Sequence, residues 1–163
     1  MKTNIDLTKH MNDGMGRAML ALSGEVEKNM DRRLLELVKI RASQLNQCAY
    51  CLDMHTKDAR RLGETEQRIY ALSAWRETPF FTDRERAALE WTETLTRLSE
   101  THPGEELRAR LATCFDEDEI VALTFAVVVI NGWNRLAVPF HPPVGSYQPR
   151  GAAATPETVG ARA

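Results

Sequence analysis

The spacing of apolar residues restricts this chain more than any other feature, because they recur every three or four positions rather than at every second one. A helix with this spacing has one apolar face, which it must bury against other helices. Three stripes carry the pattern: Met15, Ala18, Leu22 and Val26; Leu35, Val38, Ala42 and Leu45; and Ala88, Trp91, Leu95 and Leu98. The sequence therefore predicts an all-α helical bundle.

Residues that favour helix ends support this prediction. An Asp or Thr side chain accepts hydrogen bonds from the free N–H groups of a first turn, and glycine suits the end of a last turn. We predict helix starts at Asp13, at Thr82 with Glu85 and at Asp116 with Glu119, a short helix over Gly104 to Cys114, and a helix end at Gly63.

One stretch favours strands by local rules. Val127 to Ile130 are β-branched, and Asn131-Gly132 is a strong hairpin signal. The cap at Asp116 and the helical stripe that begins at Ile120 favour a buried helix instead. We therefore predict a helix here.

The chain has 163 residues, which fits one domain with a core of its own. We place a helical domain over residues 1–140. Residues 141–163 are rich in Pro, Gly and Ala and lack a periodic apolar face, so we predict a flexible C-terminal tail.

The charge balance excludes some classes of partner. Lys and Arg number 21 against 23 Asp and Glu, a net charge of -2, so we expect no binding of nucleic acid or of an anionic membrane. Residues 1–7 lack the apolar core of a signal peptide, and the apolar run from Ile120 to Ile130 is shorter than the ~20 residues of a membrane span. We expect a cytoplasmic protein.

Cysteine chemistry is the strongest functional signal. In a reducing cytoplasm the chain's three cysteines are not a disulfide framework, so a close pair indicates redox catalysis or metal binding. Cys48, Cys51 and His55 are separated by three and four positions, which puts their side chains on one face of a helix. We predict a dithiol with a nearby base, and no cofactor.

The residues alone leave the roles of the two thiols open. A position near a helix N-terminus favours ionising Cys48, whereas His55, one turn beyond Cys51, favours Cys51. Two other interpretations of the pair are small buried residues and zinc ligands, although the chain lacks a second Cys/His cluster. Cys114 has no nearby partner in the sequence, and we expect it to pack.

Two further groups have alternative interpretations. Glu36 lies between Arg32 and Lys39 at helical spacing, as in a solvated ion pair, but it could instead orient His55 from the preceding helix. The run Trp133-Asn134-Arg135 could line a pocket, but packing and capping are the commoner roles of such residues, and we do not assign it to catalysis.

A longer motif surrounds the cysteines. It consists of Glu36, eleven intervening residues, Cys48-Ala-Tyr-Cys51, three residues and His55, followed later by Ala74 to Phe81 and Asn131 to Arg135. The segment from Asp13 to Phe140 resembles the alkylhydroperoxidase D (AhpD) branch of the carboxymuconolactone decarboxylase family. The decarboxylase members look different at this site because they lack the cysteine pair.

The resemblance implies an all-helical fold, homo-oligomers such as trimers or hexamers, and reduction of hydroperoxides with electrons from a thiol, lipoyl or thioredoxin-like donor. It also implies roles: Cys51 attacks peroxide, Cys48 resolves, and Glu36 with His55 relays protons. We adopt these roles as expectations. Tyr50 is a departure, since the peroxidase members carry a His there.

Other functions would use the same cysteines. A non-catalytic redox sensor would form the disulfide without turnover, and a zinc-binding structural module would hold metal. The loop from Trp75 to Phe81 concentrates three aromatic residues beside Pro79, and we expect these to cover the dithiol or to meet a neighbouring subunit.

Overall fold

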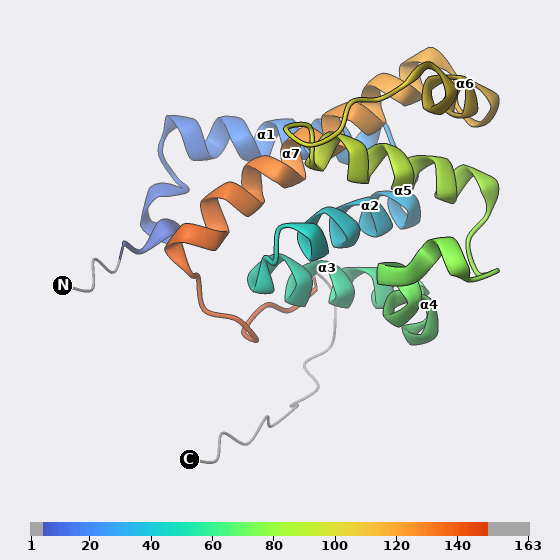
Figure 1. Cartoon of the computed structure of the whole chain (residues 1–163). Helices are drawn as coiled ribbons and strands as arrows, with labels where there is room; N and C mark the ends of the chain where they lie inside the picture. The colour runs from blue at the N-terminus through green and yellow to red at the C-terminus, as the bar shows by residue number, and fades with distance from the viewer. Residues whose placement is uncertain (1–4, 150–163) are drawn as a thin grey trace.

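The chain folds into a bundle of α-helices (Figure 1). The computed structural model describes residues 5–149, and over these residues it contains seven α-helices, two short 3₁₀ helices and no strand. The predicted all-α class is confirmed. The elements are η1 (Leu7–His10), α1 (Gly14–Lys28), α2 (Arg32–Leu45), α3 (Ala49–Arg61), α4 (Glu66–Ala71), η2 (Leu72–Glu77), α5 (Asp83–Thr96), α6 (Glu105–Cys114) and α7 (Glu117–Phe140).

The predicted caps are present. The side chains of Asp13, Thr82 and Asp116 accept hydrogen bonds from backbone N–H groups of the turns that they begin. The side chains of Glu85 and Glu119 accept hydrogen bonds from the backbone N–H of their cap residues, which completes two capping boxes. Gly63, just beyond α3, has a φ of +90°, a conformation that glycine adopts without strain.

Helix α2 is the central element, and it packs against α3, α5 and α7 (Figure 1). One core cluster joins α2 to α1, α5, α6 and α7, and a second joins α2 to α3, α4, η2 and α5. Residues on several sides of α2 are buried, among them Leu35, Leu37, Val38 and Ile40. Because α2 is enclosed in this way, its polar residues Glu36 and Ser43 are shielded from water.

The segment with conflicting local signals is part of α7, so the prediction of a helix there is confirmed. Its buried residues include Val127, which belongs to the core cluster shared with α2 and α5, and Asn131, which bonds to Asn46 at the end of α2 and to Thr96 of α5. Tertiary burial therefore outweighs the strand preference of the β-branched run. By length and composition α7 could also cross a membrane, but so could the core helix of a bundle, and α7 packs against five other α-helices.

Two of the apolar stripes are buried over only part of their length. On α1, Val26 is buried and Leu22 partly so, whereas Met15 and Ala18 are exposed. Leu98 lies beyond the end of α5 and is exposed. At the exposed ends of these two stripes, no other helix within residues 5–149 covers the apolar residues.

We expected the aromatic loop to cover the dithiol or to meet a neighbouring subunit, and it does not cover the dithiol. Trp75 and Phe81 are buried in the core cluster that contains Leu37 and Leu72, and only Phe80 is substantially exposed. The exposed apolar residues that form a stripe are instead on α7, where Val121, Phe125 and Val128 follow one another at helical spacing.

Within residues 141–149 of the predicted tail, polar contacts join the chain to α3. Lys57 donates to the carbonyl oxygens of Gly145 (3.3 Å) and Tyr147 (3.1 Å), and the Tyr147 hydroxyl donates to both carboxylate oxygens of Asp58. Polar contacts to α3 hold this segment, so the lack of an apolar face in its sequence gave no sign of them. The remainder of the predicted tail lies outside the described residues.

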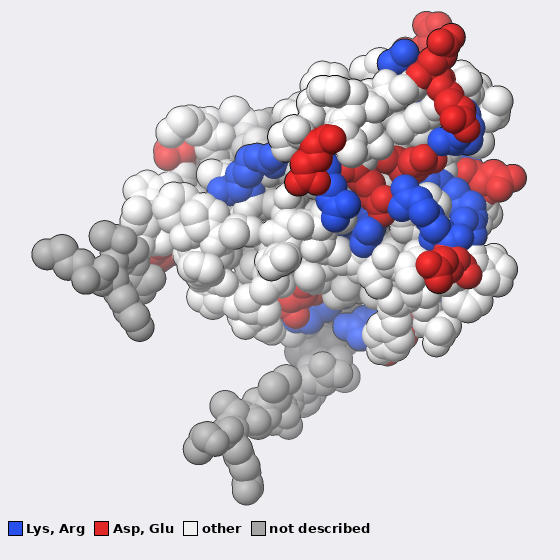
Figure 2. Space-filling model, viewed as in Figure 1, with Lys and Arg blue, Asp and Glu red and all other residues white. Residues whose placement is uncertain are grey.

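Charged side chains of both signs gather over the end of the bundle formed by α4, α5 and α6 (Figure 2). Several form linked ion pairs there, such as Arg68 with Glu64 and Glu85. Charges so interspersed leave no large area of one sign on this face.

Candidate active site

Cys48 is fixed by two helix ends at once. Its backbone N–H donates to the carbonyl of Ser43 (3.0 Å), and Gln47 N–H donates to Gln44, which together close the end of α2. Gln47 adopts a left-handed φ of +55° to make this turn. The Cys48 side chain is also the N-cap of α3, where its sulfur accepts the N–H of Cys51 at 3.4 Å. Backbone hydrogen bonds therefore fix the turn between the two helices.

This position makes Cys48 the more acidic thiol. The pKa of Cys48 is lowered to about 7, mainly because the Cys51 side chain donates a hydrogen bond to its sulfur, with the Cys51 backbone N–H and the Asn134 amide adding to the effect against the cost of burial. The pKa of Cys51 is raised above its usual range because its thiol donates that bond, is buried, and would ionise beside a thiolate. When the pair loses a proton, the negative charge therefore lies on Cys48.

The side chain of Asn134 on α7 bonds to the end of α2 and so fixes the turn before Cys48. Its side-chain oxygen accepts from Asn46 (2.8 Å), and its side-chain N–H donates to the hydroxyl of Ser43 (3.1 Å). Asn46 donates also to Asn131 (3.0 Å). Asn134 is only 1% exposed, and it lowers the pKa of both thiols. We had assigned this asparagine to packing, and the only sequence signal for another role was its place in the Asn131 to Arg135 motif.

Glu36 and His55 form a buried pair. Nδ1 of His55 lies 2.8 Å from Oε2 of Glu36, and Lys39 donates to Oε1 at 3.0 Å. Glu36 is thus not a solvated ion pair, and Arg32 pairs with Glu27 instead. Burial alone would raise the pKa of Glu36, but His55 and Lys39 outweigh it and the pKa is lowered. An ionised carboxylate only accepts hydrogen bonds, so Nδ1 of His55 is the donor in this contact and Nε2 takes no part in it.

The structure brings the four predicted residues to one region of α2 and α3. Cys48 and Cys51 are each 1% exposed and pack with Ala137 of α7 and Tyr50, while His55 lies one turn beyond Cys51 on the same helix. Cys114 is elsewhere, at the end of α6, and packs in part against the larger core cluster.

A cavity of about 360 Å³ opens beside Cys48. Most of its wall is apolar, and Cys51 does not line it. The lining residues are Gln47, Cys48, Ala49, Tyr50, Ala137, Val138, His141, Pro142, Pro143 and Val144. Of the two cysteines, a small molecule in this cavity would therefore meet Cys48.

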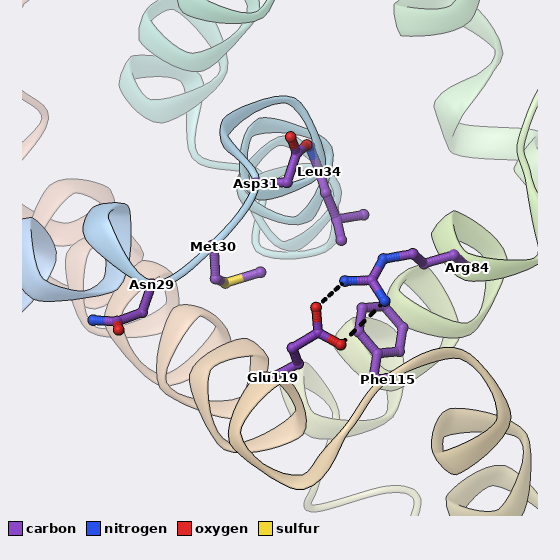
Figure 3. A pocket seen from close by; sticks show the side chains of 7 residues that line it. All are labelled: Asn29, Met30, Asp31, Leu34, Arg84, Phe115 and Glu119. Carbon is purple, nitrogen blue, oxygen red and sulfur yellow. Dashed lines mark hydrogen bonds and ion pairs between the residues drawn. The ribbon is translucent and has the colours of Figure 1, made fainter.

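A second cavity, of about 30 Å³, lies where the α1–α2 connection meets α5 and the start of α7 (Figure 3). Arg84 stacks over the ring of Phe115 and pairs with Glu119 at 2.6 Å. A space of this size holds about one water molecule. It is a gap in the packing and not a substrate site.

The described residues contain one group of possible metal ligands, namely Glu36, His55 and Asp58, with ligand atoms within 4.8 Å of one another. Neither cysteine belongs to it, so this group is not the zinc module that the cysteine spacing allowed. Its members already have partners, since Glu36 bonds to His55 and Lys39, and Asp58 accepts from Tyr147.

Comparison with known proteins identifies the family of this chain. Residues 13–94 match the model of the carboxymuconolactone decarboxylase family. The uncharacterized protein YdfG of Bacillus subtilis is 46% identical over 112 residues, which are 69% of this chain and 76% of YdfG.

Solved structures show the same fold. A protein of unknown function from Agrobacterium tumefaciens, proposed to be the antioxidant defence protein AhpD, superimposes with a TM-score of 0.84 at 38% identity, covering 90% of this chain and all of the other. An uncharacterized peroxidase-related protein from Silicibacter superimposes at 0.71 with 23% identity, over 80% of this chain and 70% of the other, which shows the fold alone. The chain therefore belongs to the carboxymuconolactone decarboxylase family, as an AhpD-like member.

Proposed function

We propose that the protein is a thiol-dependent hydroperoxide reductase that works through a Cys48–Cys51 disulfide. The observation that carries this proposal is a coupled pair of buried thiols at the start of α3, with the pKa of Cys48 lowered to about 7. At neutral pH about half of such thiols are ionised, against a few per cent for an ordinary cysteine. The thiolate is the form that attacks peroxides.

The reaction starts at Cys48. Its thiolate attacks the terminal oxygen of the hydroperoxide, the O–O bond breaks, and the leaving alkoxide takes up one proton to give the alcohol. Cys48 is then a sulfenic acid. With the charge on Cys48 gone, the repulsion that helps to raise the pKa of Cys51 is removed.

Cys51 completes the oxidation. Its sulfur attacks the sulfur of the sulfenic acid, an S–S bond forms, and the S–O bond breaks. His55 accepts the Cys51 proton, and the departing hydroxide is protonated to water. A dithiol donor, such as a lipoyl group or a thioredoxin-like protein, then supplies two electrons and two protons to regenerate both thiols.

This order reverses the roles that the family resemblance implies, in which Cys51 attacks and Cys48 resolves. Two features support the reversal: the Cys48 sulfur accepts the N–H of Cys51, in line with its lowered pKa, and of the two cysteines only Cys48 lines the cavity. Trapping with dimedone distinguishes the orders. We expect label on Cys48 in the Cys51→Ser protein and none on Cys51 in the Cys48→Ser protein. The opposite labelling would establish the order that the resemblance implies.

Turnover tests the proposed activity itself. With excess dihydrolipoamide or reduced thioredoxin, the wild type and Cys114→Ser should consume an alkyl hydroperoxide continuously, and Cys48→Ser should not. Formation of one disulfide per chain without turnover by any dithiol donor would instead indicate a redox sensor.

The same proposal includes a cytoplasmic location, which suits a dithiol that must be reduced in each cycle, and a homo-oligomer such as a trimer or hexamer. The exposed stripe of Val121, Phe125 and Val128 supports an interface between copies. Light scattering should give an oligomer for the wild type and a smaller species for Val128→Glu. A monomeric wild type at micromolar concentration would contradict the interface.

A further inference from the structure

Residues 141–147, called the strap below, turn back from the end of α7 and run to α3 (Figure 1). Two left-handed residues produce the reversal: His141, with a φ of +47°, ends α7, and Gly145 has a φ of +96°. Between them stand Pro142 and Pro143, whose rings restrict the backbone. The strap therefore has a defined path.

Polar contacts with one side of α3 hold the strap. Asp53 accepts the N–H of Gly145 at 3.2 Å and pairs with Lys57, which donates to two strap carbonyls. Asp58 accepts the Tyr147 hydroxyl through both oxygens, at 3.0 and 2.9 Å. These contacts are partly exposed, so each is weaker than a buried bond and the strap can be released locally.

The strap also walls the dithiol cavity. His141, Pro142, Pro143 and Val144 line it on one side, while Cys48 and Tyr50 line it on another. Cys48 is nevertheless only 1% exposed. A cavity of about 360 Å³ accepts a small molecule, whereas a sulfur carried on a protein must approach Cys48 in line with the bond that it forms or breaks.

We propose that the strap determines which reactants reach Cys48: closed against α3, it admits small reactants through the cavity, and it must be released before a bulky thiol donor can engage the Cys48–Cys51 pair. This inference rests on the proposed function, because it assigns the two halves of that cycle to two states of the strap. Asp53, Lys57 and Asp58 hold the closed state, and Tyr147 supplies the side-chain bond on the strap.

The test uses two reagents with the same reactive group and different size. N-methylmaleimide is small, and N-(1-pyrenyl)maleimide is bulky and rigid. Each is added to the full reduced chain in a Cys114→Ser background, and modification of Cys48 is followed by peptide mapping. The variants are Tyr147→Phe and Lys57→Met. Tyr70→Phe is the matched control, because the Tyr70 hydroxyl bonds to Glu66 on exposed α4, outside the strap.

We expect Tyr147→Phe and Lys57→Met to raise the rate with the bulky reagent about tenfold and to change the rate with the small reagent less than about twofold, because each loses a bond to a charged group that holds the closed strap. Tyr70→Phe should change neither rate. Equal acceleration of both reagents, or no acceleration of the bulky one, would overturn the proposal. The readout needs no peroxide, so it can fail or succeed independently of the proposed activity.

Discussion

Two buried glutamates, Glu36 on α2 and Glu93 on α5, show how the same side chain serves different purposes. Glu93 accepts from Arg41 (2.6 Å), Trp75 (2.8 Å) and Arg76, none of which gives up its proton near neutral pH. Burial opposes ionisation of Glu93, but these donors outweigh it and its pKa is lowered.

Glu36 accepts from Lys39 and from the ring of His55. The imidazole differs from every donor around Glu93, because its second ring nitrogen can accept a proton. The comparison indicates that Glu93 stabilises the fold, whereas Glu36 holds in position the imidazole that the proposed cycle uses as its base.

The largest expected effect is at the base itself. His55→Ala should slow disulfide formation by about 10² to 10⁴, since the Cys51 proton then has no positioned acceptor. Glu36→Gln should slow it more weakly, on the order of tenfold. Quenched-flow measurement of the disulfide, with dimedone to trap the sulfenic acid, should show that acid accumulating in both variants. An unchanged rate in His55→Ala would remove the proposed relay.

The same substitution at the other glutamate should act on stability. Glu93→Gln leaves Arg41 and Arg76 without their counter-charge and should lower the free energy of unfolding by about 2 kcal/mol, with little change in the rate of disulfide formation. Urea unfolding measures this loss. Because the pKa of Glu93 is lowered in the fold, its stabilisation is present above the ordinary carboxyl pKa and disappears as pH falls through the folded value, so the difference between wild type and variant should shrink in acid. A Glu93→Gln protein as stable as the wild type but slow to form the disulfide would reverse the comparison.

A smaller effect, on the pH dependence of Cys48 alkylation, should test the acidity of the thiol separately from the role of Glu36 and His55. The rate of alkylation of Cys48 by a small reagent should rise with pH around a midpoint of about 7, because only the thiolate reacts. Asn134→Ala removes one hydrogen-bond donor near the sulfur and should move the midpoint up by about one pH unit. Asn12→Ala, on the exposed chain before α1, is a control that should leave it in place. A midpoint near 8.5 in the wild type would show that the bonds from Cys51 and Asn134 do not activate Cys48.

Local rules recovered most of the fold. Asp13, Thr82 and Asp116 are capping residues whose partners lie within three positions, so sequence alone identifies them. Cys48 at the start of α3 was also predicted, because the turn at Leu45 to Gln47 separates two periodic stretches. The helical stripe in α7 decided correctly against the hairpin signal at Asn131-Gly132.

The missed features depend on contacts between distant positions. Asn134 meets Ser43 and Asn46 across about ninety residues of chain, and Tyr147 meets Asp58 across a similar separation. The pairing of Glu93 with Arg41 and Trp75 is of the same kind. No periodicity or cap signals such contacts, since they arise only when the bundle closes. The role of Glu36 was suggested by the family resemblance and not by its helical neighbours.

The central claim is that Cys48 and Cys51 act together as a redox pair, and peptide mapping by mass spectrometry after one equivalent of an alkyl hydroperoxide tests it most directly. The account predicts a single Cys48–Cys51 disulfide with Cys114 still free, because only the first two thiols lie within one turn of each other at the start of α3. A dominant link to Cys114, or two unreacted thiols in the motif, would contradict it.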